Sequence, residues 1–185
     1  MPERYVWLAW SSAFLAPWLA LYWAAAAQRR TMLWTSLATA PFGLTEPLFV
    51  PEYWNPPSLF DLAQRTGFDI ESLIFCFAIG GVGSALYNGI TRRRLAPLPI
   101  GEVMHPRHRY HRAALYGPFA VFPALYFFPW NPIYPGIIAM VAGAAAAMLC
   151  RPDLVRKTLT GGALFLGYYV IFMLGLKGFA PGYIE

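Results

Sequence analysis

The chain has 185 residues, of which 58% are hydrophobic and only 12% are charged, and its formal net charge is +5. Soluble domains are about half apolar and need a polar outer shell, so this composition indicates a protein surrounded by lipid. The positive charge is spread over several separate loops, which favours membrane headgroups over nucleic acid as its partner.

Six stretches of the chain reach or approach the length of about 20 apolar residues that a membrane-crossing helix needs. They are residues 5–27, 31–50, 68–90, 114–129, 133–150 and 159–177. The fourth is short and carries three prolines, so we expect it to be kinked or to pair with the fifth through the tight turn "PWNP". No stretch alternates apolar and polar residues as a membrane barrel does. The sequence therefore predicts an all-α, polytopic transmembrane bundle of about six helices, forming one integral membrane domain over residues 1–185.

The basic residues predict the orientation of this bundle. Eleven of the fourteen lysines and arginines lie after the first, third and fifth stretches, whereas seven of the nine acidic residues lie on the opposite side. Basic loops stay in the cytoplasm. We therefore expect a protein of the inner (cytoplasmic) membrane whose two termini are both non-cytoplasmic.

An imperfect internal repeat divides the chain further. The segment "AAAAQRRTMLWTSL" (24–37) is similar to "AAAAMLCRPDLVRKTLTGGAL" (144–164). This similarity predicts a duplicated three-helix unit, with a first unit at 1–90, a basic cytoplasmic loop at 91–113 and a second unit at 114–185 that lacks a last helix. A chance similarity between two alanine-rich helix ends is the alternative.

Three carboxylates lie near the outer ends of the second and third stretches. Glu46 is about four residues from the end of one, and Asp69 and Glu71 begin the other, so all three share a depth of roughly 5 Å inside the boundary. Asp69 and Glu71 point about 200° apart on a helix, so only one of them can face a given neighbour. We predict that Glu46 and Glu71 form a catalytic pair, because two carboxylates in a low-dielectric site share a proton. A role as helix N-terminal acid is the stronger interpretation for Asp69.

The residues around these acids resemble a known family. The run 46–75 contains "YWNP" (53–56), Gly67, "DIES" (69–72) and Phe75. It resembles the membrane-integral lycopene cyclase domain of bacteria, archaea and fungi, in which a loop with an aromatic residue and Asn-Pro precedes a Pro-x-Glu-Glu motif. The first motif glutamate falls on Glu71. Asp69 stands at the position of the proline and Ser72 at that of the second glutamate.

The resemblance implies cyclisation of a carotenoid or related isoprenoid without net redox change. In that family a carboxylic acid protonates a terminal double bond, a carbocation closes the ring and a base removes a proton. Glu71, Glu46 and Asp69 are then the candidate catalytic residues, and Phe49, Tyr53, Trp54 and Phe75 the candidate substrate-binding residues, since aromatic faces stabilise cations. An aromatic belt at the membrane interface is the alternative for these side chains. This chemistry needs no metal and no cofactor, and we expect neither.

Two alternatives remain open at this level. The chain could be a non-catalytic membrane subunit that binds an isoprenoid, a pigment or a partner helix, as a homo- or hetero-oligomer. A small-solute transporter is less favoured, because few polar residues lie near the midplane to line a pathway. The cluster "HPRHRYHR" contains His105, His108 and His111. Three imidazoles can bind a metal, but the interleaved arginines repel a dication, so a basic loop that contacts headgroups is the favoured interpretation.

Overall fold

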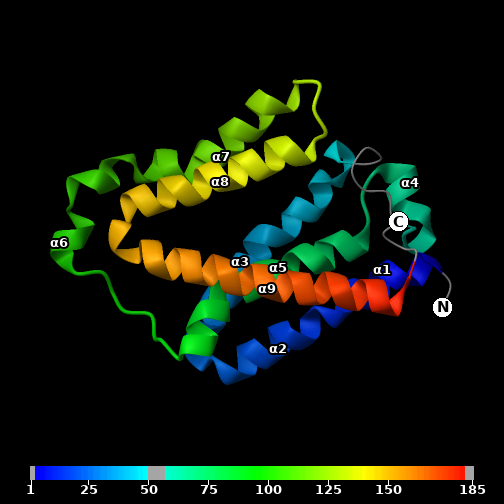
Figure 1. Ribbon diagram of the computed structural model, residues 1–185, viewed down its shortest axis with the longest axis horizontal. Helices are drawn as coiled ribbons and strands as arrows, with labels where there is room; N and C mark the ends of the chain where they lie inside the picture. Colours follow the sequence, from blue (N-terminus) through cyan, green and yellow to red (C-terminus); the bar gives the residue numbers. More distant parts are fainter. Residues whose placement is uncertain (1–2, 50–56, 182–185) are drawn as a thin grey trace. The chain divides into compact units, whose positions relative to one another are not determined.

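The computed structural model describes residues 3–49 and 57–181, and within these ranges the chain is helical with no strand (Figure 1). The elements follow one another as helices and short 3-10 turns. They are η1 (Glu3–Tyr5), α1 (Val6–Ala13), α2 (Leu15–Ala24), η2 (Ala26–Gln28), α3 (Arg29–Thr39), η3 (Ala40–Leu48), η4 (Leu59–Asp61), α4 (Leu62–Thr66), α5 (Ile70–Thr91), α6 (Ile100–Val103), η5 (Pro106–Tyr110), α7 (His111–Tyr126), α8 (Ile133–Cys150), η6 (Pro152–Leu154) and α9 (Val155–Phe179). The predicted all-α class is confirmed.

The predicted count of six membrane spans is not confirmed. Three segments of the described chain are long and apolar enough to cross a membrane: Ile70–Thr91, Ile133–Cys150 and Pro152–Phe179. A fourth arises if Glu3–Ala24 and Ala26–Leu48, which are bent by 106° at Ala25, form one broken span. Helix α7 has only 16 residues and contains Pro118 and Pro123, which explains why the fourth predicted stretch falls short.

The chain forms two compact units, which are described separately. Unit 1 comprises Met1–Leu95 and Thr160–Glu185, and unit 2 comprises Ala96–Leu159. In unit 2, α7 packs along α8, and the two helices are joined by the turn that "PWNP" predicts. Gly143 of α8 permits this approach, because a Cβ atom there would lie 2.6 Å from the Pro118 side chain.

Helix α5 is the centre of unit 1 and packs against α1, α2, α3 and η3. Its glycines allow close crossings: a Cβ atom on Gly81 would collide with Trp18 and Ser36, which are joined by a 2.9 Å bond from Trp18 Nε1 to Ser36 Oγ. Small residues at helix contacts serve the same purpose in membrane proteins generally. The core beside this crossing contains Trp18, Met32, Val82 and Ala85.

Candidate functional site: a buried carboxylate cluster

Asp69 begins helix α5 and fixes the geometry of its first turn. Its backbone is extended (φ −135°), and its Oδ1 accepts a 2.6 Å hydrogen bond from the Ser72 amide, as an N-cap aspartate does. The side chain is fully buried. The structure therefore places Asp69 at the helix N-terminus, in the position favoured by the sequence, but away from water.

Glu46 reaches this turn from η3. Its Oε2 accepts a 3.0 Å bond from the Asp69 amide, and its Oε1 accepts a 2.8 Å bond from the Ser72 hydroxyl. Gly43, one turn earlier, makes the approach possible: a Cβ atom there would lie 2.7 Å from the backbone of Ser72 and Leu73. The side chain of Glu46 is thus held by two donors at a backbone-to-backbone contact.

Glu71 is held from a different direction. Its Oε1 accepts a 2.8 Å bond from the Leu59 amide of η4, and its side chain is fully buried. Ser58 shapes this loop by accepting a 2.8 Å bond from the Ala63 amide, while Phe60 and Asp61 adopt positive φ angles of 59° and 55°. The donor to Glu71 is therefore set by a strained loop rather than by a regular helix.

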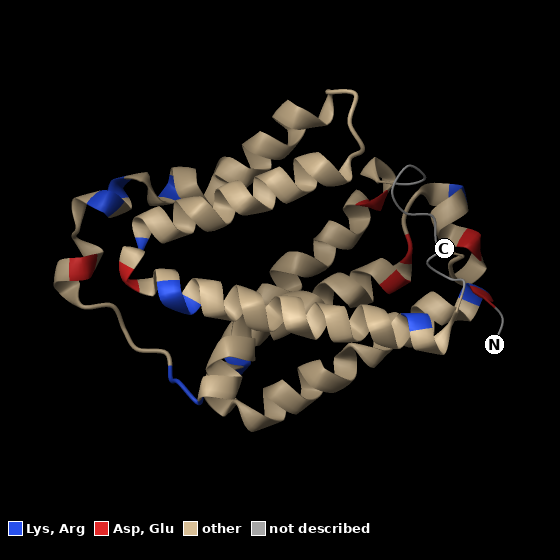
Figure 2. Ribbon diagram, in the orientation of Figure 1, with Lys and Arg blue, Asp and Glu red and all other residues tan. Residues whose placement is uncertain are grey.

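The three carboxylates share one electrostatic environment. A negative charge on Asp69 or Glu71 opposes a charge on Glu46. None of the ion pairs formed within residues 3–49 and 57–181 involves these groups. Within the same residues, Asp69 Oδ2 and Glu71 Oε2 are buried without a hydrogen-bond partner. Burial and the like charges of neighbouring carboxylates both disfavour ionisation in such a cluster. Figure 2 shows these acidic segments at the end of η3 and the start of α5.

An aromatic cluster begins one helical turn from Glu71. The ring centroid of Phe75 lies 5.5 Å from that of Trp7 and 5.2 Å from that of Phe14, edge-on to the latter. The Phe172 ring of α9 is tilted by 38° against Phe14, with 3.6 Å between the two centroids. Residues i and i+4 share a helix face, so Phe75 lies on the same face of α5 as Glu71. Trp7, Phe14 and Phe172 did not emerge from the sequence, because no local pattern ties them to residues 60 to 160 positions away.

The remaining predicted substrate residues are placed as follows. Phe49 is half-buried at the C-terminal end of η3, where its amide donates a 2.8 Å bond to the Glu46 carbonyl. Tyr53 and Trp54 lie outside the described residues. The hydrogen bond from the Ser72 hydroxyl to Glu46 was not predicted from the sequence. Only the N-cap pattern was recognisable there, with Asp69 three positions before Ser72.

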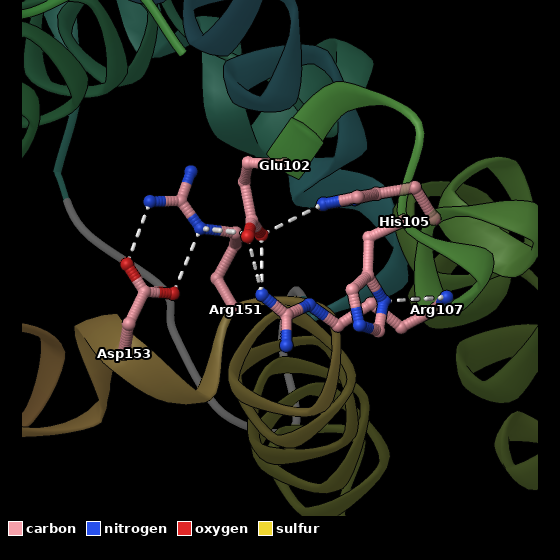
Figure 3. Close-up of polar contacts among 6 residues, drawn as sticks. Glu102, His105, Arg107, Arg151 and Asp153 are labelled. Carbon is pink, nitrogen blue, oxygen red and sulfur yellow. Dashed lines mark hydrogen bonds and ion pairs between the residues drawn. The ribbon is translucent and has the colours of Figure 1, made fainter. Parts of the chain in front are cut away.

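A second acidic cluster lies in unit 2, around Glu102. In Figure 3, Glu102 lies between Arg107 and Arg151, and Arg151 also pairs with Asp153. Arg107 Nη2 is 2.6 Å from Glu102 Oε2, and His108 Nε2 is 3.1 Å from Oε1. The hydrogen bonds from Arg107 and then His108 lower the pKa of Glu102 below its ordinary value.

The three histidines do not converge on one point. His105 Nδ1 accepts a hydrogen bond from the Arg107 amide, His108 faces Glu102, and the His111 ring lies 6.0 Å from that of His108. Within the described ranges, no group of three His, Cys, Asp or Glu side chains has the spacing of a metal site. These residues belong to an ion-paired loop.

Comparison with protein-family models, curated proteins and solved structures finds no match to this chain.

Proposed function

We propose that the chain is a membrane-embedded isomerase that cyclises the end of a carotenoid or related isoprenoid by proton transfer, in the manner of lycopene cyclases. The observation that carries the proposal is the buried carboxylate cluster without a cation, one helical turn from the aromatic cluster of Phe75, Trp7 and Phe14. A proton held among acids and a set of rings beside it are the two features that carbocation chemistry requires.

Glu71 is the proposed acid. Its Oε2 has no partner among the described residues, so a proton on this atom is available to a terminal carbon–carbon double bond. Addition of the proton creates a tertiary carbocation, which Phe75 and its neighbours stabilise through their ring faces. An internal double bond of the same molecule then attacks the cation, a carbon–carbon bond forms and the ring closes.

Glu46 is the proposed base. It accepts two hydrogen bonds, from the Asp69 amide and the Ser72 hydroxyl, and these donors stabilise a negative charge on its carboxylate. It removes a proton from the carbon next to the cation, and a new double bond forms. Return of that proton from Glu46 to Glu71 restores the starting state, so the reaction needs no oxidant and no cofactor. Asp69 caps α5 and accepts from the amide of Ser72, whose hydroxyl donates to Glu46.

The setting of the reaction is part of the proposal. The hydrocarbon substrate dissolves in the bilayer, and Phe49, Tyr53 and Trp54 are proposed to contact it. The distribution of basic residues favours the cytoplasmic membrane, with both termini on the non-cytoplasmic side. Association with a second membrane chain, identical or different, would supply further helices.

The test is expression of the full chain in cells that accumulate lycopene, followed by chromatography of the carotenoids. Cyclic products are expected from the native chain. Glu71→Gln removes the acidic proton and should abolish them, with a loss of at least about 100-fold, the range of general acid catalysis. Glu3→Gln makes the same change at an exposed residue of unit 1 and should leave the yield unchanged.

Two outcomes would contradict the proposal. An undiminished yield from Glu71→Gln would remove Glu71 from the reaction. The absence of any cyclic product from the native chain, with the protein confirmed in the membrane, would favour the alternative of a non-catalytic subunit that binds a pigment or partner helix.

A further inference from the structure

A second feature of unit 1 lies at the opposite end of α5 from the carboxylates. Residues 24–28, at the bend between α2 and α3, and the last turn of α5 surround a hollow of about 470 Å³. Asn88, Gly89 and Arg92–Arg94 complete its lining. This volume falls in the range of roughly 300–1,000 Å³ that is typical of small-molecule sites. We call this feature the arginine hollow.

Three positive charges lie around the arginine hollow. Arg92, Arg93 and Arg94 are exposed, and none of them takes part in an ion pair within residues 3–49 and 57–181. Figure 2 shows the three residues as a continuous basic segment that follows α5. Guanidinium groups bind phosphate oxygens in a bidentate manner, so three of them around one hollow favour a phosphate group.

Hydrogen bonds fix the bend beside the arginine hollow. Arg29 covers carbonyls at the end of α2, where the negative end of the helix dipole lies: its Nε donates to Tyr22 O at 2.8 Å and its Nη2 to Trp23 O at 3.4 Å. The buried Gln28 spans the hollow, donating to the Arg93 carbonyl and accepting from Asn88 Nδ2, each at 3.4 Å. These contacts tie the end of α5 to the bend at residue 25.

The backbone at Arg92 points to the same use. Arg92 ends α5 in the left-handed conformation (φ 53°), a position that glycine normally occupies, and the Arg93 amide then bonds to the Asn88 carbonyl at 3.1 Å. An arginine there sacrifices local stability and keeps a third guanidinium at the rim. Backbone strain of this kind concentrates where a ligand is bound.

The location favours a lipid as the source of the phosphate. Helix α5 is long enough to cross a membrane, and the arginine hollow lies where it ends, at the depth of headgroups. We propose that the arginine hollow binds the phosphate of an anionic phospholipid. This proposal goes beyond the proposed enzymatic function, because it uses no residue of the carboxylate cluster.

The experiment uses the full chain in neutral detergent, with dissociation constants measured by thermophoresis for three probes. The probes are short-chain phosphatidylglycerol, short-chain phosphatidylcholine and inorganic phosphate at fixed ionic strength. We expect phosphatidylglycerol to bind most tightly. Replacing Arg92, Arg93 and Arg94 together by Gln should weaken its binding roughly 100-fold, at about fivefold for each arginine.

The matched control replaces Arg109, Arg112 and Arg156 by Gln, which removes the same charge from exposed residues of unit 2. Its affinity should remain within about twofold of the native chain, since none of these residues lines the arginine hollow and salt screens exposed charges that lie away from a ligand. The single variant Arg93→Gln, with an expected loss of about fivefold, guards against misfolding of the triple variant.

Each outcome decides the proposal. Binding of phosphatidylglycerol that is lost only in the variants of the hollow supports a lipid ligand. Tight binding of inorganic phosphate with the same loss supports the phosphate site but assigns it to a soluble ligand. Equal losses in the two triple variants, or no loss in either, would overturn the site. None of these results depends on whether carotenoid products form.

Discussion

Glu46 and Glu102 carry the same chemical group, but one lies in unit 1 among neutral donors and the other in unit 2 between two arginines. Glu46 is buried and accepts bonds from an amide and a hydroxyl. The Glu102 side chain is 20% exposed and accepts from Arg107, with Arg151 within 3.6 Å. A carboxylate with cationic partners stays ionised and acts as a structural tie, whereas one buried among other acids must share protons with them. The neighbouring side chains, and not the residue type, therefore determine whether a glutamate forms a structural ion pair or a candidate acid–base site.

The largest expected difference between the two clusters is in stability. Glu46→Ala leaves the Asp69 amide and the Ser72 hydroxyl buried without this acceptor, at a cost of about 1–3 kcal/mol for each donor. Glu102→Ala removes a solvent-screened ion pair and should change the unfolding temperature little. The measurement is thermal unfolding of both variants in the same detergent. A gain in stability from Glu46→Ala would mean that repulsion among the carboxylates outweighs the two hydrogen bonds.

A smaller effect is expected from the backbone contact that brings Glu46 to α5. In Gly43→Ala the new methyl group meets the backbone of Ser72 and Leu73, which cannot move aside as a side chain does, so we expect a loss of about 1–3 kcal/mol. Gly117→Ala in α7 is the matched change in unit 2, where nothing lies within 4 Å of the added atom. Thermal unfolding of the two variants compares them directly, and similar results would contradict the close approach of η3 and α5.

The smallest effect concerns pH and is confined to unit 2. The pKa of Glu102 is lowered in the folded chain, so its ion pairs contribute stability above the ordinary value of 4.5. That contribution is lost as the pH falls through the lowered folded pKa. Hydrogen exchange of residues 100–110, corrected for the intrinsic effect of pH, should accelerate below this point. The same residues in Glu102→Gln should show no such step, and a step that persists there would assign it to another group.

The sequence predicted the parts of the fold that depend on local pattern. The length of the apolar stretches predicted α5, α8 and α9, and the prolines of the fourth stretch explain why α7 is short. A turn between the predicted stretches 5–27 and 31–50 was expected at the basic residues, but the structure places the bend earlier, at Ala25. Neither a proline nor a glycine marks the bend, where Ala25 takes φ −109° and ψ 63°.

The sequence predicted the acidic residues of the candidate site but not the groups that donate hydrogen bonds to them. Glu46, Asp69 and Glu71 stand out because ionisable residues are rare in apolar stretches. The Leu59 amide that binds Glu71 is a backbone group, and any residue type at that position would supply it. The arginine hollow was missed for a related reason: Arg92–Arg94 read as charges that set orientation, and their convergence on residues 24–28 depends on contacts some 65 positions apart.

The 106° bend at Ala25 decides how many segments of the described chain can cross the membrane. If the bent pair of helices enters and leaves the bilayer through the same face, residues 3–49 and 57–181 contain three segments that can cross. If the pair traverses the bilayer as one broken segment, the same residues contain four. One change of backbone direction thus separates a re-entrant hairpin from a complete crossing.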